Sequence, residues 1–365
     1  LDEWCSTGNI SYSEADLSYQ ATISPEAAVI AKSVEEGIRS RRVLALMFGD
    51  TSMGMINGYF GPRLLNPIGF TEHKVDQAWL IDRGRDVTDR RIEAAYRFVL
   101  EHGVEFHYLE TGAEDFDENA TKEQLRDYLT ALDLIDEFKA DCLGWQYQLG
   151  LIKLRPPSDF AEGLLNSVCR PESNGDTIAT ATEADQGNLV PMEMMKRLLK
   201  AKDLHQAVMF HDVRWGAEHD GRFIWLLLNS GSSGAYAFNH DAETLKGVHS
   251  YRQPSGYFPT PGGTFAGESL PGDITWAREY IKEGELWMDI GRGEVVKLPP
   301  DVRDEWWNGT TREWPFMAAD LRIGQETLMA HYLSNHVAVA YGDIFQEMVA
   351  LSEALGFKIR LLGVR

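Results

Sequence analysis

Short apolar runs alternate with longer segments of helical periodicity through roughly the first 205 residues. Runs of this kind, bounded by turn residues, are typical of buried strands, and the segments between them carry apolar residues at helical spacing. The alternation predicts an open, largely parallel sheet with helices on both faces. The expected strands are 43–48, 104–109, 142–148 and 177–182.

Two helices are predicted from their capping residues. Residues 25–39 begin with Pro25 after Ser24, a favourable N-cap, so a helix is expected to start there. Residues 121–138 carry an apolar stripe, and Thr121 with Gln124 forms a potential capping box at the start of this segment.

After residue 206 the pattern changes to short apolar runs between turn residues, which favours a mostly antiparallel, barrel-like or sandwich-like part. The division that follows is an N-terminal arm or remnant of a missing domain (1–40), an α/β domain (41–205) and a β-rich C-terminal domain (206–365). The expected C-terminal strands are 223–228, 234–238, 273–281, 285–290, 294–298 and 357–362.

Two carboxylates follow apolar runs that are close in sequence. Glu183 follows residues 177–182, and Asp212 follows residues 207–210, with a helical pattern between the two runs. A parallel strand–helix–strand unit would place both strand ends, and both carboxylates, at one rim of a sheet. Two carboxylates held close together favour a cation between them. Strand-end carboxylates also serve as helix caps, which is the better interpretation for Asp185.

A histidine would complete an open site for a hard divalent cation. His336 lies in an apolar segment after Asn335, although a histidine in such a place is more often structural. His211 is expected to point to the opposite face of its strand from Asp212, and His219 lies in a probable turn. His336 is therefore the candidate third ligand.

Two polar strand ends remain ambiguous. Gln148 ends a strand at the same expected rim, where it is either a substrate contact or a solvated amide. Asn229 and Ser230 follow an apolar run and precede Gly231, which is typical of a turn. The glycine-rich residues 49–61 lack dinucleotide spacing, so a simple turn is the better interpretation there.

Composition narrows the partners. The 365 residues carry a formal net charge of −21, which argues against nucleic acid and anionic membranes as partners. The three cysteines and the absence of a signal-like or spanning segment favour a reduced, cytoplasmic location.

From about residue 40 to residue 365, the sequence resembles the L-fucose isomerase family of aldose–ketose isomerases. Each matching piece is short, but their shared order makes the set specific. The pieces are Ser52-Met-Gly-Met55, Gly144-Trp-Gln-Tyr-Gln148, Glu183-Ala-Asp185, His211-Asp-Val-Arg214, Asn229-Ser-Gly231, Tyr257 to Gly263, Trp314-Pro315, and Ser334-Asn-His336 with Tyr341-Gly-Asp343.

The resemblance implies a metal-dependent isomerase. It places the family's metal ligands on Glu183, Asp212 and His336, with Mn²⁺, or another divalent cation such as Mg²⁺ or Co²⁺, as the cofactor. It implies a small sugar as substrate, an ene-diol pathway with Glu183 and Asp212 as acid and base, and a homo-oligomer, either a trimer or a hexamer. The substrate contacts that it implies are Gln148, Ser230, Tyr257, Trp314 and Asn335.

Two departures from the family pattern keep other functions open. The family continues its glutamate turn as Asp-x-x-Gly-Ala-Leu-Thr, whereas this chain has Asp185-Gln-Gly-Asn-Leu-Val-Pro191. The family also has an N-terminal α/β domain, of which only a stub would fit before residue 40. A sugar-binding or regulatory protein without turnover is therefore the alternative, and a metal-dependent hydrolase is a third hypothesis.

Overall fold

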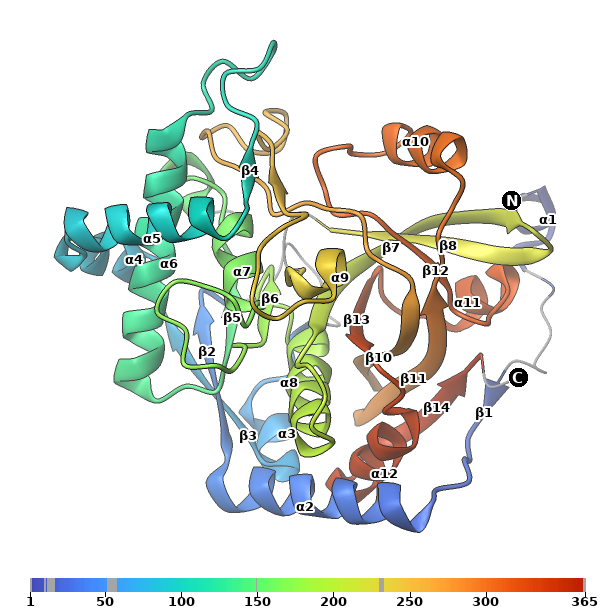
Figure 1. The fold of residues 1–365 in the computed structure, drawn as a ribbon. Coiled ribbons are helices and arrows are strands. Elements are labelled where there is room, and N and C mark those ends of the chain that lie inside the picture. The colour runs from blue at the N-terminus through green and yellow to red at the C-terminus, as the bar shows by residue number, and fades with distance from the viewer. Residues whose placement is uncertain are drawn as a thin grey trace.

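The computed structural model describes residues 2–9, 11, 17–50, 58–148, 150–229 and 233–363 (Figure 1). In the N-terminal half, four parallel strands form a sheet in the order β3-β2-β5-β6. Their bounds are β2 Val43–Phe48, β3 Phe70–Val75, β5 Cys142–Trp145 and β6 Thr180–Thr182. The helix-and-strand alternation of the sequence predicted a parallel sheet, but not all of its strands: β3 was not expected, and the expected strand 104–109 is reduced to two residues outside this sheet.

Both faces of this sheet are covered by helices. Leu46 and Phe48 belong to a core shared with α5 and α6, whereas Val43 and Met47 belong to a second core shared with α2 and α8. Successive residues of β2 point to opposite faces, so one apolar strand supplies both cores. The helices are α2 Pro25–Arg41, α3 Pro62–Leu65, α4 Ala78–Arg83, α5 Asp89–Glu101, α6 Glu118–Phe138, α7 Asp159–Leu165 and α8 Gln186–Ala201.

The C-terminal half contains a closed antiparallel barrel. Six strands pair in the order β11-β10-β13-β7-β8-β12, and β12 pairs back onto β11. Each of these pairings is antiparallel, and β14 and β1 extend the sheet outside the ring. The predicted fold class is confirmed. The strands are β1 Leu17–Ser18, β7 Val208–His219, β8 Arg222–Leu228, β10 Gly272–Lys282, β11 Glu285–Val295, β12 Met317–Asp320, β13 His336–Tyr341 and β14 Lys358–Leu362.

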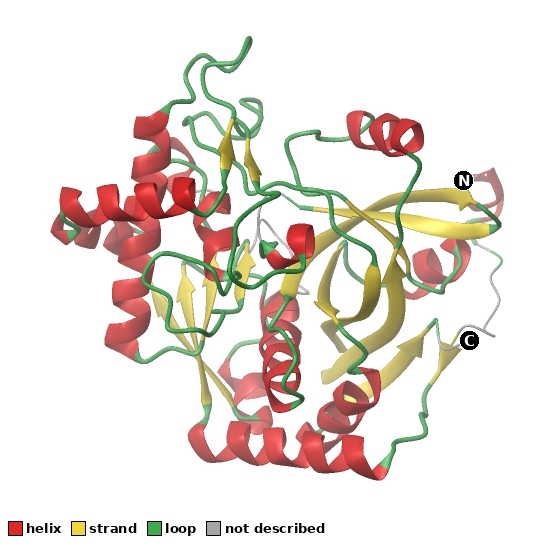
Figure 2. Ribbon diagram, in the orientation of Figure 1, coloured by secondary structure: helices red, strands yellow, loops and turns green. Residues whose placement is uncertain are grey.

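Figure 2 shows helices surrounding the small parallel sheet and strands gathered in the barrel, with α8 between the two. A separate two-stranded parallel ribbon joins β4 (Glu105–Phe106) to β9 (His249–Ser250). The remaining α-helices are α1 Asp2–Thr7, α9 Tyr236–Asn239, α10 Pro300–Asn308, α11 Gln325–His331 and α12 Phe345–Leu355. Within the described residues, no helix has both the length and the apolarity needed to cross a bilayer.

One predicted arrangement is wrong. Strand β7, which carries Asp212, does not continue the parallel sheet of β6 but pairs antiparallel with β13 and β8 in the barrel. The reason is the hairpin after β7: Asp220 and Gly221 both have positive φ, and this tight turn returns the chain alongside its own strand. Glu183 and Asp212 therefore reach the same site from two different sheets.

Local predictions had mixed outcomes. Ser24 caps α2, as predicted, and its hydroxyl accepts from the Ala27 N–H at 3.2 Å. The prediction of a capping box at Thr121 and Gln124 is wrong, because α6 begins earlier, with Asp117 as its N-cap. The Gln124 side chain instead donates to the Pro157 carbonyl at 2.6 Å.

Two further strand predictions are wrong. Residues 234–238 contain helix α9 in place of a strand, and the two strands expected at 285–290 and 294–298 are one continuous strand, β11. Gly291 lies in the middle of β11. A side chain would not fit there, because a Cβ would come within 2.2 Å of the Trp276 ring on the paired strand β10. This glycine reflects close packing between strands, although glycine usually signals a break.

Candidate metal and substrate site

Glu183 sits in a strained turn at the end of β6. Glu183 and Ala184 both adopt left-handed backbone conformations, with φ of 59° and 52°. Such conformations cost a non-glycine residue about 1–3 kcal/mol each, and they concentrate at functional sites. The turn is fixed by the Ala184 N–H, which donates to the Trp145 carbonyl at 3.2 Å. It leaves the Glu183 side chain 14% exposed at the end of the parallel sheet.

Asp212 and His336 lie side by side on neighbouring strands of the barrel. They are directly paired residues of β7 and β13, so their side chains lie on one face of the sheet. The His336 Nε2 atom is 3.3 Å from Asp212 Oδ1 and 3.7 Å from Glu183 Oε2. The structure thus brings together all three residues that the sequence indicated as metal ligands.

The imidazole stands between the two carboxylates. Each carboxylate lies within 4 Å of His336 Nε2. Even so, Glu183, Asp212 and His336 are not among the described groups whose ligand atoms all lie within 4.8 Å of one another. Two carboxylates repel each other without a cation between them. An ion bound here would therefore draw the two carboxylates closer together.

Asp185 positions the histidine from behind. Its Oδ2 lies 2.7 Å from His336 Nδ1 and also forms a buried ion pair with Arg278. Its Oδ1 accepts from the Gly187 N–H at 2.9 Å, so the predicted role as N-cap of α8 is confirmed. A carboxylate on one imidazole nitrogen sets the tautomer and orients the other nitrogen as a ligand. The second role of Asp185 was not predicted.

Charge in the site favours an ionised Asp185 and a protonated His336. Burial alone would raise the pKa of Asp185, but Arg278 and His336 outweigh it and hold that pKa well below its ordinary value. Burial alone would lower the pKa of His336, but the hydrogen bond to Asp185 and the charges of Asp212, Asp185 and Glu183 raise it. A metal ion binding to Nε2 would therefore displace a proton.

Two amides contact the carboxylates. Gln148 donates from Nε2 to Glu183 Oε1 at 3.2 Å, and its buried Oε1 has no hydrogen-bond partner among the described residues. That oxygen is a ready acceptor for a ligand hydroxyl. Asn229, which the sequence indicated only as a turn residue, donates to Asp212 Oδ1 at 3.1 Å.

An arginine links the site to two predicted substrate contacts. Arg214 pairs with Asp212 Oδ2 at 2.8 Å, and its guanidinium lies 5.2 Å from the ring centre of Trp314. Trp314 in turn lies 6.4 Å from the exposed Tyr257, centre to centre. Arg214 thus connects these two aromatic residues to Asp212.

The other candidates have different outcomes. Asn335 precedes His336 and is exposed, and its carbonyl accepts from the Val213 N–H at 2.7 Å. Ser230 lies outside the described residues. His211 is fully buried, burial lowers its pKa to about 3, and neither ring nitrogen has a hydrogen-bond partner among the described residues.

The end of the glycine-rich segment reaches the site. A Cβ on Gly58 would lie 2.7 Å from Asp185 Oδ1, so only glycine fits against this carboxylate. The Phe60 N–H donates to Gln186 Oε1 at 2.9 Å. This contact holds the segment against the first turn of α8. Residues 51–57, with the Ser52-Met-Gly-Met55 motif, lie outside the described residues.

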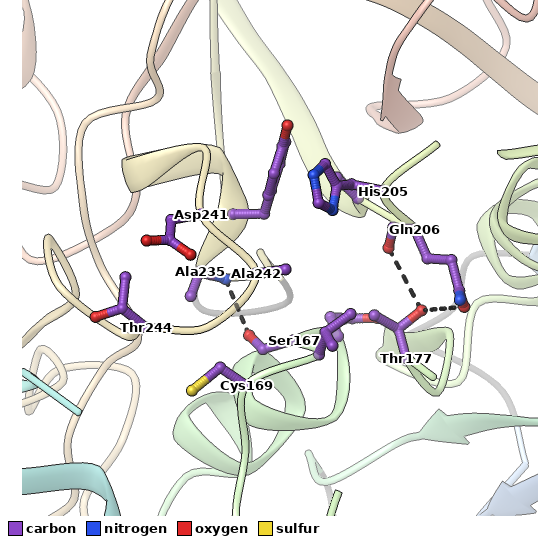
Figure 3. A pocket seen from close by; sticks show the side chains of 13 residues that line it. Ser167, Cys169, Thr177, His205, Gln206, Ala235, Asp241, Ala242 and Thr244 are labelled. Carbon is purple, nitrogen blue, oxygen red and sulfur yellow. Dashed lines mark hydrogen bonds between the residues drawn. The ribbon is translucent and has the colours of Figure 1, made fainter. Parts of the chain in front are cut away.

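A hollow near the start of β7 lies apart from the candidate site. Figure 3 shows this narrow hollow among residues that include Cys169, His205 and Asp241. Ser167 accepts there from the Ala235 N–H at 2.9 Å. None of the predicted site residues lines this hollow, so it is not part of the candidate site.

The fold and the site define a class of protein: an α/β half and a closed antiparallel barrel that jointly hold a carboxylate–imidazole cluster. Residues 227–362 match the family model described as L-fucose isomerase, C-terminal domain. For residues 227–362, this match supports the resemblance to the L-fucose isomerase family that the sequence predicted.

The matched stretch covers only part of the candidate site. It includes His336 but neither Glu183 nor Asp212. The family points to an isomerase of carbohydrate metabolism. Among curated proteins, no sequence matches this chain.

Proposed function

We propose that this protein is a metal-dependent aldose–ketose isomerase of the L-fucose isomerase type. The observation that carries the proposal is the convergence of Glu183 and Asp212, from two different sheets, on one nitrogen of His336. The opposite nitrogen is already held by Asp185. A structural histidine would need only one of these carboxylates, whereas an ion site needs the whole set.

Glu183, Asp212 and His336 would hold the divalent cation. Two carboxylate oxygens and one imidazole nitrogen suit Mn²⁺, and also Mg²⁺ or Co²⁺, and leave positions open for substrate oxygens. When bound, such an ion polarises the sugar carbonyl and stabilises negative charge on the two oxygens of an ene-diol.

The proton transfers fall to the two carboxylates. In isomerisation, a base removes the proton on carbon 2 and an acid delivers a proton to carbon 1. The hydroxyl proton on oxygen 2 passes to oxygen 1 as the carbonyl moves from carbon 1 to carbon 2. Glu183 and Asp212 flank the site and serve as this base and acid. The buried Oε1 of Gln148 is positioned to accept a hydrogen bond from a sugar hydroxyl.

The test is ketose formation from a panel of 6-deoxyhexose and pentose aldoses with added Mn²⁺. We expect turnover of at least one sugar and its loss on chelation. The variants Glu183→Gln and Asp212→Asn should each lose roughly 10²–10⁴-fold in kcat, the usual contribution of general acid–base catalysis. Asp220→Asn, in the exposed hairpin turn of the same strand, is the matched control and should keep full activity. Unchanged turnover in Glu183→Gln would contradict the mechanism.

One observation favours a second function, sugar binding without turnover. The departure from the family pattern places Asn188 where the family has glycine, and its buried side chain accepts a hydrogen bond at 3.0 Å from Arg278, the ion-pair partner of Asp185. The floor of the site is therefore built differently from the family pattern. Sugar binding by calorimetry, with no ketose formed under the same conditions, would support this alternative.

A further inference from the structure

The ribbon of β4 and β9 ties together distant parts of the chain. Strand β4 follows helix α5 of the α/β half, and β9 lies on the segment that leads into barrel strand β10. The ribbon is held by backbone bonds, from the Glu105 N–H to the Val248 carbonyl and from the His107 N–H to the Ser250 carbonyl, each 2.9 Å long. Glu105 pairs directly with His249 across the ribbon.

Three side chains with metal-binding atoms converge on this ribbon. Glu105, His107 and His249 each offer one ligand atom, and these atoms all lie within 4.8 Å of one another. His107 Nε2 is 3.2 Å from His249 Nδ1, and His249 Nδ1 is 3.5 Å from Glu105 Oε2. Ligands about 2.0–2.1 Å from a tetrahedral zinc ion are separated by about 3.4 Å, so both spacings fit such an ion.

A second carboxylate orients one of the imidazoles. Glu110 Oε1 lies 3.0 Å from His107 Nδ1, the nitrogen that points away from the cluster. This contact favours a proton on Nδ1 and leaves Nε2 with its lone pair facing the cluster. The Tyr251 ring stacks on the His107 ring at 4.0 Å and restricts its rotation.

The cluster is accessible, and its charge suits a cation. The His107 and His249 side chains are 26% and 32% exposed, so an ion can enter directly from solvent. Glu105 and Glu110 supply two negative charges. The charge of Arg312 opposes them, and its guanidinium stacks 3.6 Å from the Trp307 ring centre. Two carboxylates against one guanidinium leave a net attraction for a divalent cation.

We propose that Glu105, His107 and His249 bind a divalent transition-metal ion of the zinc type, with water at the fourth position. The ion clips β4 to β9 and so fastens the α/β half to the segment leading into the barrel. This site shares no residue with Glu183, Asp212 and His336, and it does not rest on the proposed isomerase function. The competing explanation is a plain hydrogen bond between the two imidazoles, which predicts no effect of zinc.

The experiment counts bound zinc by equilibrium dialysis and elemental analysis. It uses the full chain carrying Glu183→Gln and Asp212→Asn, so that the other candidate site does not contribute. We expect one equivalent of Zn²⁺ in this background and its loss when His107→Asn and His249→Asn are added. Saturating zinc should also raise Tm by roughly 3–5 °C, and only when both histidines are present.

His219→Asn is the matched control. Within the described residues His219 forms an ion pair with one carboxylate, that of Asp220 at 3.6 Å, so the change should leave the zinc count unchanged. If the double histidine variant does not fold, Glu105→Gln serves in its place, since this side chain is 68% exposed, and it should weaken zinc binding at least tenfold. One equivalent of zinc that survives these changes, or no zinc in the starting background, would overturn the proposal. Failure of the isomerase assay would leave this count unaffected.

Discussion

Asp185 is the residue on which the geometry of the candidate site depends. It is fully buried, caps α8, orients His336 and pairs with the buried Arg278. A buried ion pair becomes costly when one partner is removed, because the other charge is left uncompensated. One carboxylate thus connects the stability of the fold with the orientation of the His336 imidazole.

Asp185→Asn should therefore have two separate effects. It should lower the unfolding free energy by about 3–5 kcal/mol, because Arg278 loses its charged partner, and weaken Mn²⁺ binding about 10–100-fold, because His336 loses its orienting carboxylate. Urea unfolding and a Mn²⁺ titration measure the two effects. Asp185→Asn/Arg278→Met should recover stability but not metal affinity. Recovery of both would mean that Asp185 acts only through Arg278.

Glu279 predicts a pH dependence of stability. Both of its carboxyl oxygens are buried without a hydrogen-bond partner among the described residues, and burial raises its pKa well above the ordinary value. The folded state therefore holds a proton that the unfolded state releases above about pH 4.5. The Glu279 carboxyl therefore destabilises the folded protein increasingly as pH rises above that value.

The isosteric variant Glu279→Gln should become more stable than the wild type as pH rises from about 4.5. The gain should grow by up to about 1.4 kcal/mol per pH unit until the folded-state pKa is passed. Urea unfolding at a series of pH values measures it. Glu218→Gln, an exposed change on β7, is the control and should show no such trend. Parallel stability curves for Glu279→Gln and wild type would contradict this assignment.

At the residue scale, the sequence identified the three side chains that meet in the candidate site but not the residues that support them. Glu183 and Asp212 stand out because each follows an apolar run, and His336 was favoured by its context and by the family resemblance. Arg278 gave no signal, since its pairing with Asp185 joins residues far apart in the chain. Contacts of this kind are set by the packing of α8 on β10, which spacing alone does not encode.

At the scale of elements, apolar patterning predicted most strands but not the sheet to which each belongs. Both β6 and β7 are buried at their starts, and nothing local distinguishes a parallel partner from an antiparallel one. The hairpin turn at Asp220 and Gly221 was the available signal. Capping was predicted correctly at Ser24, where proline fixes the helix start, and wrongly at Thr121, where Asp117 competes as a cap.

Helix α8 is held close to strand β10 by a glycine. A Cβ on Gly187 would lie 2.5 Å from Arg278 Cζ and 2.8 Å from the Glu279 carbonyl oxygen, and a backbone atom cannot move aside cheaply. Gly187→Ala should therefore lower the unfolding free energy by about 1–3 kcal/mol. The added Cβ should also shift Asp185 and so change the orientation of the His336 ring. A titration with Mn²⁺ would detect this change as a loss of affinity.

The matched control is another helical glycine changed in the same way. Gly37 lies within α2, where an added Cβ would have no neighbouring atom within 4 Å, and its φ is negative, as in any helix. Gly37→Ala should raise the unfolding free energy by about 0.4–1 kcal/mol, because alanine reduces the entropy of the unfolded chain. Chemical denaturation of both variants, side by side, checks the predicted opposite signs.

At the scale of the whole molecule, the two halves share their hydrophobic cores. One core contains Leu46 of the parallel sheet together with Leu226 of the barrel, and the other contains Met47 together with Phe210. Helix α8 packs against β5 and β6 on one side and against β7, β10 and β13 on the other. The candidate site lies at this junction, so its geometry depends on both halves being folded together.

This shared packing predicts that the two halves unfold in a single cooperative transition, because α8 packs against both of them. Met195, fully buried in α8, belongs to the core that holds Met47 and Phe210. Met195→Ala should lower the unfolding free energy by about 2–5 kcal/mol. The midpoint of unfolding should shift by the same amount whether it is followed by near-ultraviolet circular dichroism, tryptophan fluorescence or calorimetry. Met329→Ala, at a 55% exposed position of α11, should shift none of them. Two separated transitions in Met195→Ala would show that the α/β half and the barrel unfold independently, and that α8 stabilises only one of them.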